Sequence, residues 1–208
     1  MKKFLSVLLL LILPQVSHSI VTLRGSYGGL LSEKIKLNEL CQGSCTNAQN
    51  APSTSLPNIG FGADAIIKIP FFPFGLGVRY EKLGLKADSN GIVGESDLTR
   101  TAAIINHRFI DTIIHFGIIG TYGINHSGSM TIKENTNLVM DLKPGKIESV
   151  SLGLELEVKP LIVLPLIVGA EAGYQMYKWN QTVNSVNSTT KDMDLSGPYV
   201  KVFLGFDL

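Results

Sequence analysis

Apolar and polar residues alternate with a period of two along most of this sequence. In residues 150–158, Val and Leu occupy every even position, and Ser, Gly and Glu occupy the odd ones. Successive side chains of a β-strand point to opposite faces, so the alternation predicts strands and disfavours helices. It predicts eight strands whose lengths approach the roughly 9 to 11 residues that a tilted strand needs to cross hydrocarbon. Their ranges are 21–32, 59–69, 76–81, 98–107, 114–124, 150–158, 168–177 and 200–208.

The polar face of the predicted strands carries mainly glycine and single charges. Small residues suit the narrow lumen of such a barrel, whose interior has room only for side chains, whereas the water-facing side of a soluble sandwich carries long charged and β-branched polar residues. We therefore predict an all-β fold, a closed antiparallel transmembrane β-barrel of about eight strands. A soluble periplasmic β-domain is the alternative. Residues 98–107 alternate poorly, so the face that they turn outward stays open.

The connections and the aromatic residues predict an orientation. Long polar connections at 32–57, 87–97, 127–145 and 180–194 alternate with short ones at 70–73, 108–111 and 160–165. Short turns face the periplasm and long loops face the exterior in outer-membrane barrels, which places both termini in the periplasm. Aromatic residues near each end of the strands predict two interfacial girdles. Those near the long loops are Tyr27, Tyr80, Tyr122, Tyr174 and Trp179, and those near the short turns are Phe71, Phe72, Phe74, Phe109 and Phe206.

The first 19 residues are predicted to be a cleaved signal peptide. Lys2 and Lys3 precede an apolar stretch of about 10 residues, too short to span a bilayer, and small residues follow at 17–19. The domains are therefore a signal peptide at 1–19 and an outer-membrane barrel at 20–208.

Charge and cysteine content limit the partners. Without Lys2 and Lys3, the 18 basic residues become 16 against 17 acidic ones, a balance that argues against nucleic acid. Cys41 and Cys45 are expected to form a local disulfide in an oxidising compartment, with metal binding as the weaker alternative. No cofactor is expected, and we expect a monomer.

The C-terminal segment resembles the assembly signal of small outer-membrane barrels of the OmpA, OmpX and OmpW type. Its residues are Tyr199, Val200, Val202, Leu204, Phe206 and Leu208. The chain ends in Leu208 where the pattern has an aromatic residue. The resemblance implies the cell outer membrane of a Gram-negative-type bacterium, with outer-membrane lipid and the barrel-assembly machinery as partners.

Ten charged residues are predicted to face the lumen, four basic and six acidic. An unpaired charge in a narrow lumen is costly, so a salt-bridged interior that stops free conduction is expected. A gated polar path or a proton relay is the alternative. The residues are Arg24, Asp64, Lys68, Arg79, Glu81, Glu155, Glu157, Glu171, Lys201 and Asp207.

No catalytic or metal-ligating residue is predicted. His126 and Ser127 are adjacent and therefore point to opposite faces of a strand, which prevents a dyad within the strand. His115 is expected to form hydrogen bonds in the lumen. Glu155 and Glu157 share the lumen face only because strand residues two apart do so.

The leading functional hypothesis is a non-enzymatic outer-membrane protein. Its structural, adhesive or surface-interaction role would be carried by its long extracellular loops, which would contact an unidentified surface partner. An OmpW-like channel or transporter for hydrophobic compounds is the alternative, and a lipid A-modifying barrel enzyme ranks below both.

Overall fold

The computed structural model describes residues 20–36, 55–68, 72–89, 91–160, 165–186 and 189–208. The predicted signal peptide and the predicted disulfide between Cys41 and Cys45 lie outside these residues. The described residues form ten strands. They are β1 (Val21–Lys36), β2 (Ser55–Lys68), β3 (Phe74–Ser89), β4 (Ile92–Asp111), β5 (Ile114–Glu134), β6 (Asn137–Lys143), β7 (Lys146–Val158), β8 (Leu166–Asn184), β9 (Thr189–Asp194) and β10 (Gly197–Asp207).

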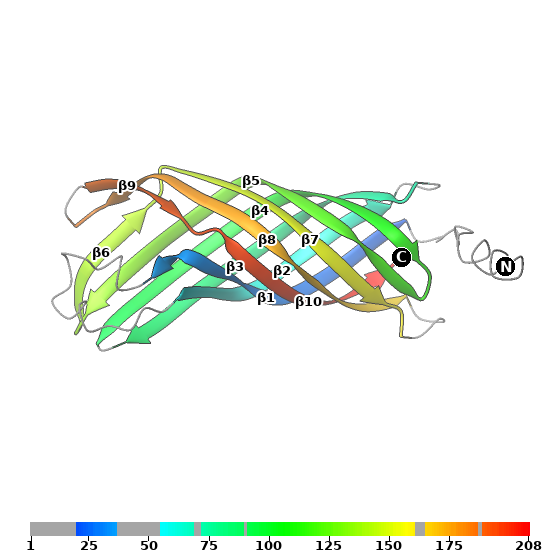
Figure 1. Cartoon of the computed structure of the whole chain (residues 1–208), viewed down its shortest axis with the longest axis horizontal. Helices are drawn as coiled ribbons and strands as arrows, with labels where there is room; N and C mark the ends of the chain where they lie inside the picture. Colours follow the sequence, from blue (N-terminus) through cyan, green and yellow to red (C-terminus); the bar gives the residue numbers. More distant parts are fainter. Residues whose placement is uncertain (1–19, 37–54, 69–71, 90, 161–164, 187–188) are drawn as a thin grey trace, which may run out of the picture.

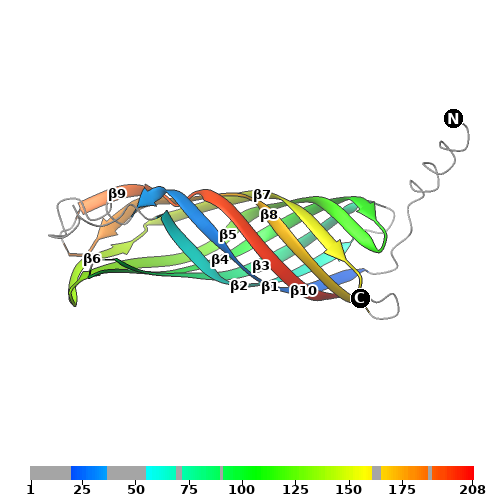
Figure 2. The same ribbon diagram turned by 60° about the horizontal axis from the view of Figure 1, so that its bottom comes forward.

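Eight of these strands close into an antiparallel ring in the order β1, β2, β3, β4, β5, β7, β8 and β10. The ring closes where β10 pairs with β1, from Thr22↔Asp207 to Leu30↔Tyr199. Figures 1 and 2 show an elongated barrel with β6 and β9 at one end, the loop end, and the C-terminus at the other, the turn end. The prediction of a closed antiparallel β-barrel is confirmed.

The strands extend further toward the loop end than the alternation predicts. β3 and β4 stay paired up to Ser89↔Ile92, so most of the predicted connection at 87–97 is strand. β5 continues to Glu134, and β6 then pairs back along it. Backbone hydrogen bonds to a neighbouring strand keep these polar stretches extended although they lack the apolar alternation.

The outward face of the ring is apolar, as the alternation predicts. On β7, Leu154 is 53% exposed whereas the neighbouring Glu155 is 3% exposed. The barrel thus turns apolar side chains outward and charges inward, the reverse of a soluble protein, and this is the arrangement of a transmembrane β-barrel. No helix in the described part of the chain is long and apolar enough to cross a membrane.

Aromatic side chains lie at both ends of this apolar belt. The four predicted tyrosines are exposed toward the loop end, and Phe72, Phe74, Phe109 and Phe206 are exposed toward the turn end. The prediction that Trp179 belongs to the girdle is wrong, because Trp179 is fully buried inside the barrel. Tyr174 and Met176 face outward on β8, so Trp179, three residues after Met176, faces inward.

The interior has two zones. A cluster of apolar residues fills the loop-end half of the barrel. In the remainder, charged and polar residues lie beside a smaller apolar group of Ile66, Ile104 and Ile119. Trp179 lies in the apolar cluster, five residues beyond the girdle residue Tyr174. The cluster contains Leu30, Leu83, Leu85, Ile92, Leu98, Met130, Ile132, Met140, Leu142, Tyr177, Trp179, Met193, Leu195 and Tyr199.

We predict that Leu154→Arg destabilises the barrel by about 2–4 kcal/mol, because it places a charge at the middle of the lipid-facing belt. Urea unfolding of protein refolded into phosphatidylcholine vesicles measures the change. Ser127→Arg, an outward substitution on the loop side of the Tyr122 girdle, is the control and should change stability by less than about 0.5 kcal/mol. Equal effects of the two substitutions would contradict the position of the belt.

Candidate functional site: the charged lumen

Charges from three neighbouring strands occupy the middle of the lumen. Arg24 on β1, Asp64 on β2 and Arg79 on β3 are register partners, and all three are buried. Asp64 accepts a hydrogen bond from Arg24 Nε at 2.7 Å and one from Arg79 Nε at 2.8 Å. One carboxylate thus contacts two guanidinium groups, and the excess positive charge requires carboxylates from another strand.

The balancing carboxylates come from the opposite side of the ring. Glu155 on β7 and Glu171 on β8 are register partners. Arg79 donates to the two oxygens of Glu171 at 2.9 and 2.6 Å, a bidentate pair, and Arg24 donates to Glu155. The hydroxyl of Tyr199 donates to Glu171 at 2.7 Å. These ion pairs cross the lumen and join β1–β3 to β7 and β8.

A second group of charges lies on the loop side of this cluster. Glu81 accepts hydrogen bonds from Lys201 and, at 2.8 Å, from Arg100. Arg100 also donates to Thr121, whose hydroxyl oxygen lies 2.5 Å from Ser151 Oγ. The group carries two cations and one anion, so it offsets the excess carboxylate of the central cluster.

A third group lies at the turn end. Asp207 pairs with Lys68 and, at 2.7 Å, with Lys159. Glu157 pairs with Arg108 at 3.3 Å. Each carboxylate therefore has at least one cation beside it, and the three groups together form a nearly neutral network along the lumen.

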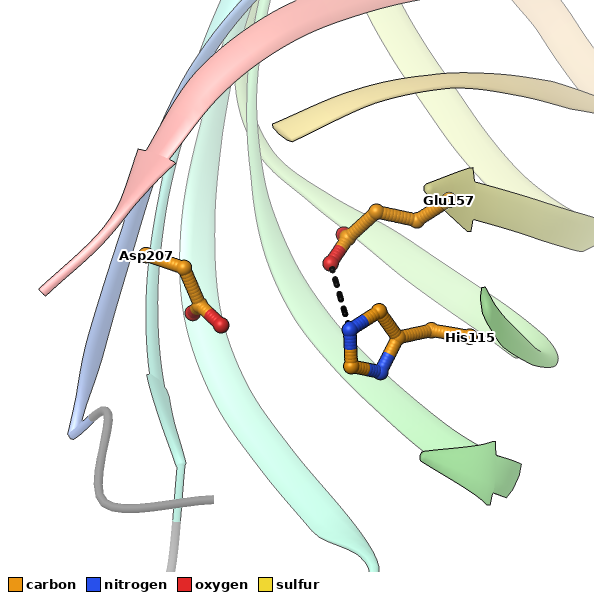
Figure 3. A group of neighbouring side chains, drawn as sticks. All are labelled: His115, Glu157 and Asp207. Carbon is orange, nitrogen blue, oxygen red and sulfur yellow. Dashed lines mark ion pairs between the residues drawn. The ribbon is translucent and has the colours of Figure 1, made fainter. Parts of the chain in front are cut away.

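His115, Glu157 and Asp207 come close together in this third group, as Figure 3 shows. One donor atom from each lies within 4.8 Å of the others, and His115 Nε2 is 3.6 Å from Glu157 Oε1. Such a set resembles a divalent-cation site. The two carboxylates, however, already contact three cationic side chains, which would repel a metal ion. The arrangement favours an ion-pair cluster over a metal centre.

All ten charged residues predicted to face the lumen lie on the inner face and take part in these ion pairs. Lys68 is partly exposed at the turn end, and the other nine are buried. The ion pairs join side chains from opposite walls of the barrel, so they hold these walls together across the lumen.

The sequence interpretation missed Arg100 and Arg108, which are buried on the inner face of β4. Leu98 and Ile104 also face inward there, while Ile105 faces outward, so apolar residues on both faces hide the period of two. A usable signal was the charge imbalance, since four cations could not balance six anions. Arg100 and Arg108 supply two of the further cations from the strand whose facing was open, and Lys159 supplies another at the turn end.

His126 meets a serine that the sequence interpretation did not consider. Its Nε2 lies 2.7 Å from Ser149 Oγ on β7. The ladder between β5 and β7 ends at Tyr122↔Val150, and this edge of β5 pairs again from Met130↔Leu142 on β6, while its other edge stays paired with β4. The hydrogen bond bridges this interruption, and the absence of a Cβ at Gly123 leaves room for it, because that atom would lie 2.2 Å from His126 Nε2.

The predicted assembly residues divide between the two faces. Val200, Val202, Leu204, Phe206 and Leu208 are exposed on the outward face, whereas Tyr199 is buried in the lumen. Tyr199 therefore belongs to the charge network through Glu171, and the outward apolar row begins one residue later.

We predict that Arg79→Met destabilises the barrel by about 3–5 kcal/mol, because it removes one partner from Asp64 and from Glu171 while both stay buried. Urea unfolding in vesicles measures the loss. Lys82→Met on the same strand is the matched control. Lys82 forms an exposed ion pair with Asp97 at 3.4 Å, so its loss should cost no more than about 1 kcal/mol. A loss of unfolding free energy below about 1 kcal/mol for Arg79→Met would show that its ion pairs across the lumen do not stabilise the barrel.

Comparisons with known proteins do not assign the chain to a family. No protein-family model and no curated protein matches the chain. Among solved structures, the chain is similar to Neisserial surface protein A (13% identity, 90% of this chain, 96% of that one, TM-score 0.45). It is also similar to the outer membrane protease OmpT from Escherichia coli (8% identity, 90% and 91% coverage, TM-score 0.43). These two likenesses do not decide between a surface protein and an enzyme.

Proposed function

We propose that this protein is a non-enzymatic outer-membrane barrel that acts through the surface of its loop end. The observation that carries the proposal is the filled interior, in which a nearly neutral charge network is followed by an apolar cluster. A lumen filled in this way offers little room for solute, and the strands extend beyond the belt to hold a polar surface away from the membrane. Both termini would lie in the periplasm.

A channel for hydrophobic compounds is less well supported. Such a channel needs an apolar path that leads from the loop end into the membrane-spanning part. Below the apolar cluster, the lumen instead holds Glu81 in ion pairs with Arg100 and Lys201. An apolar solute would have to separate buried ion pairs to pass, which is costly.

We predict that the purified protein produces no large unitary current in planar bilayers, because its interior is filled by side chains. Steady current steps as large as those of an open porin measured in the same bilayers would contradict the proposal. Arg24→Ala combined with Arg79→Ala removes the central cations, and this double variant is the control that tests whether a gap in the network admits ions.

The orientation has its own test. Cys41 and Cys45 lie outside the described residues, between the end of β1 at Lys36 and the start of β2 at Ser55. Because both of these strand ends are at the loop end, we predict that the two cysteines face the cell exterior. A maleimide too large to cross the outer membrane should label both cysteines on intact cells after mild reduction. Labelling that requires a broken outer membrane would invert the orientation and remove the surface role.

The pair of His126 and Ser149 allows a test of enzyme activity, because a hydrogen bond of 2.7 Å matches a base and its nucleophile. Ser149 is only 4% exposed, and the ring of Tyr177 lies against His126 in an edge contact. We therefore predict that a fluorophosphonate probe leaves the folded protein unlabelled. Labelling that disappears in Ser149→Ala would show an activated serine and support the enzyme alternative.

A further inference from the structure

The outward wall of the described barrel has a hollow of about 500 Å³ over β1, β2 and β3, bordered by residues of β4 and β10. Gly25, Ala63 and Ala65 form its floor, and they are the smallest outward residues of this region. Larger side chains surround the floor. They are Leu23, Val78, Tyr80, Thr101, Leu204 and Phe206.

The register explains the position of the hollow. Gly25 pairs with Ala63 on one side and with Leu204 on the other, and Ala63 pairs with Tyr80. A row across the wall thus reads large, small, small, large. A Cβ added at Gly25 would meet no atom within 4 Å, so the space outside it is open.

The central charges lie directly behind the floor. Arg24, Asp64 and Arg79 also border the hollow, but they are buried and their side chains form ion pairs inside the lumen. Only the backbone therefore separates the hollow from the most highly charged part of the lumen. Water would fill the hollow only at the cost of entering the hydrocarbon layer. Lipid chains already surround the belt, so they are the favoured occupant.

We propose that the hollow is a binding site for one acyl chain of a membrane lipid. Its volume lies within the range of about 300–1,000 Å³ of small-molecule pockets, and its lining is almost entirely apolar. Tyr80 and Thr101 add hydroxyl groups on the side of the tyrosine girdle, the depth at which lipid ester groups begin. The site would hold a lipid in a defined place and exclude water from the wall that covers the charges.

A second copy of the chain fits the hollow less well. Stable protein interfaces bury about 1,200–2,000 Å² and use roughly 20–30 residues on each side. Thirteen residues line the hollow, fewer than one side of such an interface. An acyl chain is thin and flexible, so it can fill such a space without a matching surface on a partner.

The inference rests on the proposed membrane location, and Gly25→Leu tests it. The new side chain would fill the hollow from its open side and would leave the lumen unchanged. Gly120→Leu is the matched control, because Gly120 also faces outward in the belt, with Ile105 Cγ2 at 3.4 Å, but lies outside the hollow. Each protein is refolded with dipalmitoyl phosphatidylethanolamine and passed into detergent, and native mass spectrometry counts the lipids retained.

We expect one retained lipid on the unchanged protein and on Gly120→Leu, and about tenfold weaker retention on Gly25→Leu. The loss of contact with two methylene groups is enough for such a change. Equal retention by all three folded proteins would overturn the site while leaving the proposed function intact. A dimer that disappears in Gly25→Leu would also overturn it and identify a second copy as the occupant. Failure of all three to fold into vesicles, seen as unshifted mobility on unheated gels, would instead overturn the membrane location and the site with it.

Discussion

The requirement that every buried carboxylate contacts a cation governs this structure. A charge left unpaired inside a narrow barrel costs several kcal/mol, more than most other single contacts can offset. The strands that supply the charges must therefore close into one ring. Arg79 shows the effect, because its partners Asp64 and Glu171 belong to a neighbouring strand and to the opposite wall.

The same requirement specifies the register. A slip of one residue in a strand would turn the inward charges of that strand toward the lipid and its belt residues into the lumen. The pairing of Arg24 with Asp64, and of Asp64 with Arg79, places opposite charges next to each other across two ladders. Charge and hydrophobicity thus select the same register, and this agreement makes the fold specific.

The interior and the exterior of the barrel have separate roles. Inside, ion pairs and the apolar cluster around Trp179 occupy the lumen. Outside, the loop end offers the surface proposed to act on partners, and the hollow over Gly25 is the proposed site of a lipid acyl chain. The arrangement depends on the alternation, because each strand must serve two different solvents at once.

The sequence by itself determined the barrel, the apolar belt and the ten inward charges, because a period of two assigns each side chain to a face without knowledge of its neighbours. The tertiary structure decided what depends on partners. The facing of β4, and with it Arg100 and Arg108, follows from charge balance across the lumen. The contact of His126 with Ser149 follows from an interrupted ladder, and the strand extension at the loop end follows from backbone pairing. The local alternation of residues does not predict these three features, since each depends on residues distant in sequence.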